Sequence, residues 1–386
     1  MNILYKTRNS IIHFFYVWAL KPVLFLFDPE DIHNLFTKTG HFLGRFGITR
    51  WKTRMLFGYK NSRLTQEVLG IKFENPIGLS AGFDKDIMLT EIISDVGFGF
   101  EEVGSVTSRP YAGNPRPRLW RLTKSRSLGV WFGLKNQGVE VLSKKLAGKV
   151  HRLPIGVNVA FTNCKENLEI SSAIPDYVAG AKVMEKYADY LTINLSCPNT
   201  SGGMPFLLPD NYEKLMVEID KISTSKPIFV KINPDMTHAE IDKFLEISLR
   251  HRVRGIICSN LTKNYSDADK RDALPPHGGL SGKLVYPKAL DLLSYMYKKA
   301  RLPSPAGSAN GGQVGNKFVF VFVGGVFSAD DAYRAIRQGA TLIQLITGMI
   351  FEGPQVISEI NRGLVERMNR DGFKNIIDVV GFDNKR

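Results

Sequence analysis

The stretch Tyr190-Leu-Thr-Ile-Asn-Leu-Ser-Cys-Pro-Asn-Thr200 decides the fold, because an apolar run passes directly into amides, a hydroxyl and a thiol. A short apolar run bounded by turn-forming residues is typical of a buried strand. From residue 76 onward the same pattern repeats. Short apolar runs end in Gly, Ser, Asn or Lys, and each is followed by a stretch with the pattern of a helix. Such alternation predicts an α/β fold with a parallel sheet.

Eight of these runs occur, which is the number of strands that closes a β/α barrel. They cover Ile77 to Ala81, Glu101 to Ser105, Pro154 to Ala160, Tyr190 to Ser196, Ile228 to Asn233, Gly255 to Asn260, Phe318 to Gly324 and Thr341 to Thr347. We therefore predict a (β/α)8 TIM barrel, in which ligands bind at the C-terminal ends of the strands. Those ends carry two Gly-Gly pairs and the side chains of Lys85, Asn194, Cys197, Lys231 and Asn260.

The chain has 386 residues and a formal net charge of +14, which favours anionic partners such as phospholipid headgroups or acidic metabolites. Nucleic acid is the weaker candidate, because the basic residues are scattered and no nucleic-acid-binding motif occurs. The three cysteines, Cys164, Cys197 and Cys258, are far apart, and the seven histidines are dispersed. We expect neither a disulfide framework nor a catalytic metal.

The N-terminal segment is apolar and contains no acidic residue before Asp28. Lys21-Pro22 divides it into two apolar runs, each shorter than the roughly 20 residues that span a bilayer, so a transmembrane helix is not expected. Asp28-Pro29-Glu30 predicts a helix start with Asp28 as N-cap. We interpret residues 10–50 as a two-helix amphipathic unit in a lipid interface. The alternatives are a hairpin packed on the barrel and a cleaved targeting peptide.

These patterns divide the chain into an N-terminal helical segment for membrane association, residues 1–50, and a barrel, residues 51–386. We expect a peripheral protein on the cytoplasmic face of a bacterial cell membrane, since the leader is short for a transit peptide. The mitochondrial inner membrane is the alternative. Residues 303–315, rich in Gly, Ser and Pro, indicate a flexible surface insertion.

Residues 194–200 offer carboxamides that donate and accept hydrogen bonds, which suits a planar ring bearing carbonyl and N–H groups. Cys197 offers a titratable proton acceptor, and an equally good interpretation is a small buried filler. Lys85 follows small residues that admit a flat ligand, whereas the usual fate of a lysine is solvation. Lys231 lies within an apolar run, where a buried charge is costly without an anionic partner.

Glycines follow the last elements of the predicted barrel, in Gly278-Gly279, Gly324-Gly325 and Thr347-Gly348. Barrels commonly build a phosphate site there from backbone N–H groups. Each pair by itself is also explained by a tight turn. Together they indicate a phosphorylated cofactor.

From about residue 20 to the C-terminus, the chain resembles the dihydroorotate dehydrogenases. The first matching motif, behind an apolar leader, is typical of the quinone-linked class. The motifs are Asp28-Pro-Glu-x-x-His33, Gly82-Phe-Asp-Lys-Asp86, Ser108-Arg-Pro-x-x-Gly-Asn-x-x-Pro-Arg118, Asn194-x-Ser-Cys-Pro-Asn-Thr200, Lys231-Ile-x-Pro-Asp235, Gly278-Gly-Leu-Ser-Gly-Lys283 and Val323-Gly-Gly-Val326.

The resemblance implies oxidation of dihydroorotate to orotate in pyrimidine biosynthesis, with electrons passed through FMN to a membrane quinone. It implies that Cys197 is the catalytic base, and that Lys231 stabilises the reduced flavin. The substrate would be held by Lys85, Asn194, Asn199 and Asn260. FMN would contact Ala81, Gly82, Lys85, Ser105, Asn158, Asn194, Lys231, Ser259, Gly282, Gly325 and Thr347.

Several positions depart from the quinone-linked pattern. Cys197 stands where that class has Ser and is typical of the soluble classes. A thiol is more easily deprotonated than an alcohol, so catalysis should persist with another pH profile. Val130 replaces an Asn that holds the substrate, Ile346 replaces a Tyr near the FMN phosphate, and Ser201-Gly-Gly-Met204 lacks an Arg. An FMN oxidoreductase for a related dihydropyrimidine or a soluble acceptor, and a noncatalytic membrane-associated FMN-binding protein, are therefore the alternatives.

Overall fold

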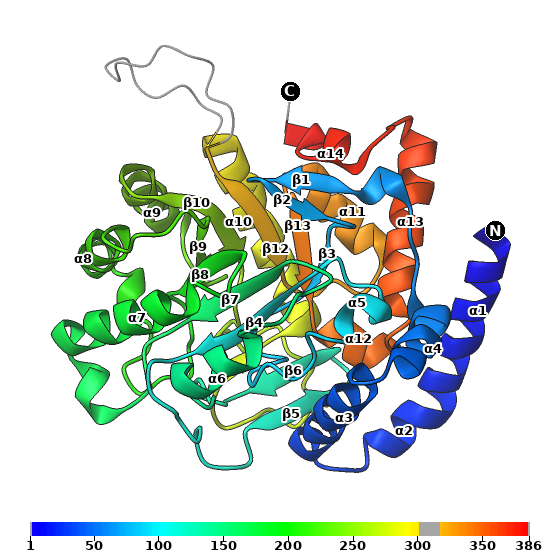
Figure 1. The fold of residues 1–386 in the computed structure, drawn as a ribbon, viewed down its shortest axis with the longest axis horizontal. Helices are drawn as coiled ribbons and strands as arrows, with labels where there is room; N and C mark the ends of the chain where they lie inside the picture. The colour runs from blue at the N-terminus through cyan, green and yellow to red at the C-terminus, as the bar shows by residue number, and fades with distance from the viewer. Residues whose placement is uncertain (1, 301–316, 385–386) are drawn as a thin grey trace.

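The computed structural model describes residues 2–300 and 317–384, and a closed barrel of parallel strands forms its centre (Figure 1). The expectation of eight barrel strands is confirmed. The strands follow one another around the barrel in chain order. They are β3 (Ile77–Leu79), β4 (Phe100–Val106), β7 (Ile155–Val159), β8 (Tyr190–Asn194), β9 (Ile228–Ile232), β10 (Val253–Cys258), β12 (Val319–Val323) and β13 (Leu342–Leu345).

The barrel strands are short, and most of their residues are buried because helices cover the outer face and side chains fill the inside. Of the polar residues that we placed at strand ends, Ser196 and Asn260 lie in the loops just past those ends, and Thr347 begins the short helix α12 (Thr347–Glu352). The main covering helices are α6 (Val139–Leu146), α7 (Ile170–Met184), α8 (Pro209–Asp220), α9 (His238–Arg250), α10 (Tyr286–Lys299), α11 (Ala329–Gln338) and α13 (Val356–Asp371).

Short helical elements connect these parts. They are α5 (Ile93–Val96), α12 (Thr347–Glu352), α14 (Ile376–Val379), η2 (Ser62–Leu64), η3 (Lys165–Leu168), η4 (Pro205–Leu207), η5 (Gly282–Leu284) and η6 (Phe382–Asn384).

Two small antiparallel sheets accompany the barrel. The hairpin of β1 (Gln66–Val68) and β2 (Ile71–Phe73) brings Phe73 against Phe100, with ring centroids 5.3 Å apart, and so closes the N-terminal end of the barrel. The second sheet joins β5 (Leu119–Leu122), β6 (Ser127–Val130) and β11 (Gly279–Leu280). Only the opposite, C-terminal end is therefore left to hold a ligand.

The N-terminal residues form helices along one side of the barrel (Figure 1). Helical conformation runs through α1 (Asn2–Phe15), the π-helical turn η1 (Tyr16–Leu20) and α2 (Lys21–Leu24). Lys21-Pro22, which separates the two apolar runs of the sequence, does not interrupt this helical conformation. Pro22 has no N–H to donate, and the wider π-helical turn, in which Lys21 N–H bonds to Tyr16 O, lets the helix pass through it.

Asp28 begins the next helix, α3 (Pro29–Gly44), as the sequence predicted. Its carboxylate accepts hydrogen bonds from the backbone N–H groups of Glu30 and Asp31 at 2.9 and 3.1 Å. The fourth helix, α4, covers Gly47–Phe57, so the segment boundary that we expected at residue 50 falls inside a helix. The helical part extends to Phe57.

Large apolar side chains are exposed on all of these N-terminal elements, among them Phe14, Trp18, Leu26, Phe42 and Trp51. Within residues 2–300 and 317–384, no helix is both long enough and apolar enough to cross a membrane. The insertion expected at residues 303–315 lies outside the described residues.

Candidate active site

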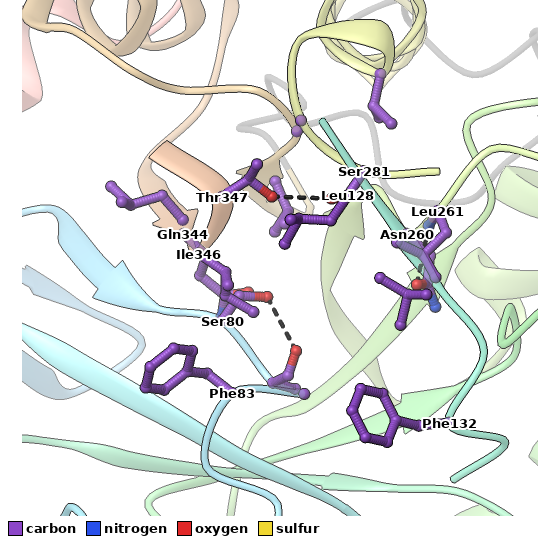
Figure 2. A pocket seen from close by; sticks show the side chains of 18 of the residues that line it. Ser80, Phe83, Leu128, Phe132, Asn260, Leu261, Ser281, Gln344, Ile346 and Thr347 are labelled. Atoms are coloured by element: carbon purple, nitrogen blue, oxygen red, sulfur yellow. Dashed lines mark hydrogen bonds between the residues drawn. The ribbon is translucent and has the colours of Figure 1, made fainter. Parts of the chain in front are cut away.

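A cavity opens at the C-terminal end of the barrel, with about 1240 Å³ of empty space when its mouth is included. Its walls come from the loops that follow the barrel strands, from the small sheet of β5, β6 and β11, and from α3. Figure 2 shows Phe83 and Phe132 at one end of this space and Thr347 and Ser281 at the other. The cavity is therefore an elongated site with an aromatic end and a hydroxyl-bearing end.

The structure brings together the residues that the sequence proposed for the site, with the exception of Asn158. The lining includes Ala81, Gly82, Lys85, Ser105, Asn194, Cys197, Asn199, Lys231, Ser259, Asn260, Gly282, Gly325 and Thr347. Asn158 is fully buried behind the wall, where its Oδ1 accepts a hydrogen bond from Ser105 Oγ. A direct contact from Asn158 to a cofactor stays a prediction.

A continuous chain of hydrogen bonds runs along one wall. Asn260 Nδ2 donates to Asn194 Oδ1 at 3.3 Å, and Asn194 Nδ2 donates to Ser105 Oγ at 2.9 Å. Behind Ser105, the amide of Asn158 donates to Glu102 Oε1 at 2.8 Å. Because each amide is fixed by its neighbour, the wall presents preorganised donors and acceptors to a ligand.

Cys197 lines the cavity and is partly exposed there. Burial raises the pKa of its thiol to about 11, although the backbone N–H of Asn199 and the charges of Lys263 and Lys231 favour the thiolate. Desolvation outweighs these stabilising contacts, so the thiol ionises less readily than a free cysteine. The thiolate of Cys197 is the form that accepts a proton, and at neutral pH it is the minor form of the side chain.

Lys85 is a cation at the aromatic end of the cavity, with its Nζ 4.1 Å from the centroid of the Phe132 ring. Burial, and then repulsion from Lys135, lower the pKa of Lys85 to about 8. A contact with an aromatic face does not use up the N–H donors of an ammonium group, so Lys85 can still donate hydrogen bonds to a ligand. An anionic ligand at this position would relieve both effects.

Lys231 projects from β9 into the barrel and is buried, with its Nζ 3.4 Å from Ser80 Oγ. Burial lowers the pKa of Lys231, and the negative charge of Glu102 opposes that shift. Glu102 is itself held by Gln344, whose Nε2 donates to Glu102 Oε2 at 2.8 Å. The lysine charge is therefore supported by a polar cluster inside the barrel.

Two amide oxygens in the lining have no hydrogen-bond partner, namely Asn199 Oδ1 and Gln344 Oε1. Both residues are buried, and an unsatisfied buried acceptor costs about 1–3 kcal/mol. Gly82, at a φ of +99°, leaves open space where a Cβ would stand. Unpaired acceptors beside open space fit a flat ligand that carries N–H donors.

The other end of the cavity is built from small and hydroxyl-bearing residues. Ser281 Oγ and Thr347 Oγ1 lie 2.9 Å apart, and Figure 2 shows this hydrogen bond across the cavity wall. Gly282 and Gly325 have φ values of +77° and +65°, and a Cβ on either would meet a carbonyl oxygen at 2.5 or 2.6 Å. This close backbone approach suits a phosphate group.

The sequence reading did not single out several polar and aromatic residues of the lining. Gln344 had a usable signal, because it is a polar residue inside the buried strand β13, as Lys231 is in β9. Lys135 follows β6, a strand that we did not predict. His33 comes from α3 and packs edge-on against Phe83, with ring centroids 4.9 Å apart. Burial lowers the pKa of His33, so this imidazole is neutral.

The departures from the quinone-linked pattern differ in their relation to the cavity. Val130 and Ile346 both line it, so each removes a polar group from the wall. Ser201 and the two glycines after it are not among the lining residues. Val130 and Ile346 are therefore the departures that change the cavity wall itself.

Comparison with known proteins gives concordant matches. A family model described as dihydroorotate dehydrogenase matches residues 63–368. The protein named dihydroorotate dehydrogenase (quinone) from Natronomonas pharaonis is 34% identical over 369 residues, which cover 94% of this chain and 98% of that protein. The protein of the same name from Sulfurovum sp. is 34% identical over 382 residues, covering 96% and 99%.

Solved structures agree with these sequence matches. The structure of DHODH from Eimeria tenella in complex with ferulenol superimposes with a TM-score of 0.80 at 27% identity, covering 93% of this chain and 96% of that one. The ligand-free form gives a TM-score of 0.74 at 27% identity, covering 90% and 99%.

Proposed function

The chain belongs to the dihydroorotate dehydrogenase family, and from this premise we propose that it oxidises dihydroorotate to orotate with FMN and a membrane quinone as acceptors. The reaction is a step of pyrimidine biosynthesis. The observation that carries the proposal is that Cys197, Lys85 and Lys231 line one cavity at the C-terminal end of the barrel.

FMN fits the donor set of this cavity. Its phosphate would lie at the end formed by Gly282, Gly325 and Thr347, and its ring would lie along Ala81, Gly82 and Ser105. Lys231, Ser259 and Asn194 would contact the ring from the barrel, with Asn158 supporting Ser105 from behind. When bound, FMN supplies an acceptor for a hydride and passes the electrons on. Lys231 supports this chemistry because a fixed cation stabilises negative charge on the reduced ring.

Dihydroorotate would occupy the aromatic end of the cavity. Lys85 would bind its carboxylate, and Asn194, Asn199 and Asn260 would bind the carbonyl and N–H groups of its ring. Cys197, as a thiolate, would take the proton from the ring carbon beside a carbonyl while the hydride leaves the neighbouring carbon. The proton and the hydride together account for the two hydrogens lost in forming orotate.

The N-terminal helical segment ends at Phe57 and precedes the barrel. Its helices would bind the membrane and admit the quinone. Exposed apolar residues of α1, α3 and α4 and a net charge of +14 support association with an anionic membrane surface. We propose peripheral attachment to the cytoplasmic face of a bacterial cell membrane, with the mitochondrial inner membrane as the alternative.

Anaerobic addition of dihydroorotate to the purified protein tests the proposal. We expect the absorption band of bound flavin to bleach, and a quinone analogue added afterwards to restore it. Fumarate and NAD serve as alternative acceptors, and faster reoxidation by either one would contradict the assignment to quinone. A flavin spectrum that does not respond to dihydroorotate would contradict the assignment of the substrate.

A further inference from the structure

Lys135 is a second cation at the aromatic end of the cavity. It belongs to the loop between β6 and α6, and its side chain lines the cavity with 31% of its surface exposed. Lys85 and His33 line the same cavity, and the positive charge of Lys135 lowers the pKa of both. Lys135 thus approaches the position where the substrate carboxylate would lie.

The acidic neighbour of Lys135 does not neutralise it. Glu30 Oε1 lies 3.5 Å from Lys135 Nζ, at the limit of a hydrogen bond. Both oxygens of Glu30 already accept shorter bonds, at 2.8–2.9 Å, from the guanidinium groups of Arg116 and Arg118. The carboxylate is thus committed to the arginines, and Lys135 retains capacity for another anion.

The cavity wall carries positive charge without a matching negative charge. Among the described residues that line it, the charged side chains are Lys85, Lys135 and Lys231, and neither Asp nor Glu contributes to the wall. Cations that share a partly desolvated space repel one another, and an anion between them removes that cost. The charge balance therefore indicates an anionic ligand that contacts more than one lysine.

We propose that Lys135 binds the substrate carboxylate together with Lys85 and replaces the amide that Val130 cannot supply. The inference rests on the proposed function and adds a residue that selects for the negative charge of the substrate. A carboxylate has two oxygens, so each ammonium group can donate to a separate oxygen.

Calorimetric titration of the FMN-loaded protein with orotate tests this role without relying on turnover. The variant Lys135→Met keeps an unbranched side chain of similar shape and removes the ammonium group, and Lys135→Arg restores the charge. Lys124→Met is the matched control, because Lys124 is an exposed lysine of the preceding turn and does not line the cavity. We expect Lys135→Met to raise the Kd for orotate about tenfold or more.

Uracil, which lacks the carboxylate, separates a charge contact from a general distortion. We expect Lys135→Met to leave the Kd for uracil unchanged, and Lys135→Arg to bind orotate nearly as well as the unmodified protein. An orotate Kd equal to that of the Lys124→Met control would overturn the proposal. An equal loss of orotate and uracil binding would also overturn it, since the residue would then only maintain the shape of the site.

The proposed function can fail separately. If the unmodified protein neither binds orotate nor loses its flavin colour with dihydroorotate, the substrate assignment itself is wrong. If the unmodified protein does both and Lys135→Met behaves identically, only the role of Lys135 is wrong.

Discussion

Glu30 of α3 and Arg118 of the loop before β5 form a buried ion pair, with Arg118 Nη2 2.8 Å from Glu30 Oε1. The two side chains are only 4% and 8% exposed. Arg118 Nε also donates to Glu30 Oε2 at 2.9 Å, so the contact is bidentate. This pair joins the N-terminal helices to the sheet that covers the cavity, and it sets the position of α3 beside the substrate site.

Replacing Glu30 by Gln should lower the free energy of unfolding by about 3–5 kcal/mol, because Arg118 would keep a buried charge without its partner. Urea unfolding followed by circular dichroism measures the change. The control is Glu218→Gln, whose ion pair with Lys221 is exposed on both sides, at 42% and 63%, and should contribute less than about 1 kcal/mol. Equal effects of the two substitutions would contradict the structural role of the buried pair.

The same pair predicts how stability responds to acid. Burial by itself would raise the pKa of Glu30, but the hydrogen bonds from Arg118 and Arg116 lower it to about 2. A carboxyl with a depressed folded-state pKa stabilises the fold above its unfolded value near 4.3, and this contribution is lost as the pH falls toward the folded value. Unfolding of the Glu30→Gln variant should therefore depend less on pH over the range from about 4.3 to 2.

Cys197→Ala should abolish flavin reduction by dihydroorotate and leave FMN bound, since the side chain supplies the base and only a small part of the wall. In the unmodified protein, the thiol pKa of about 11 implies that the thiolate fraction rises with pH throughout the neutral and moderately alkaline range. Anaerobic stopped-flow measurement at saturating dihydroorotate should show a reduction rate that increases with pH. A rate that is flat above neutral pH would exclude Cys197 as the rate-limiting base.

Substrate affinity should follow the opposite pH trend. Lys85 is a cation below its pKa of about 8 and neutral above it, so the KM for dihydroorotate should rise as the pH exceeds that value. Substrate binding itself opposes deprotonation and moves the transition upward. Lys85→Met should raise KM at every pH and remove the transition. In Lys135→Met the transition should move to higher pH, because the repulsion that lowers the pKa of Lys85 is absent.

Thr347→Val should weaken FMN binding several-fold, because it removes the hydroxyl that meets Ser281 at the proposed phosphate end. Recovery of flavin fluorescence on dilution measures the dissociation. Thr341→Val is the control, since Thr341 lies at the other end of β13 and does not line the cavity. A Kd for FMN that matches this control would remove Thr347 from the cofactor site.

Binding to membranes should depend on the apolar surface of α1 and η1. Phe14, Phe15 and Trp18 are 64%, 67% and 73% exposed, so replacing all three by Ser should reduce cosedimentation with vesicles that contain anionic lipid. Turnover with a water-soluble quinone analogue should change little. Val150→Ser removes an apolar side chain that is 95% exposed elsewhere on the surface, and it should leave cosedimentation unaltered.

The order of the barrel strands could be predicted, because each strand has a signal in its local sequence. An apolar run flanked by turn residues marks a strand wherever it occurs, and chain order then fixes the neighbours in a β/α barrel. The additional strands β5, β6 and β11 were missed because they are short and pair across distant parts of the chain, as Gly279 does with Val130. The sequence analysis did not predict that a helix continues through Pro22, where a π-helical turn removes the usual penalty of proline.

The candidate site was predictable where polar residues interrupt apolar strands or follow them directly, as with Lys231 and Asn194. Lys135 was not named from the sequence and His33 was named only within a family motif, because nothing in the sequence around either residue places it beside Lys85. Their positions follow from the docking of α3 through Glu30 and from the sheet that carries the loop after β6.

The sequence by itself determined the barrel and the location of its polar end, because hydrophobic periodicity and turn chemistry are local properties. Its family motifs added most of the polar side chains that line the cavity. Only the tertiary structure decided the electrostatics of the cavity. Burial raises the pKa of Cys197 and lowers that of Lys85, and the wall gathers lysines without carboxylates. These properties depend on how far each group is removed from water and on which charges face it, and chain order specifies neither.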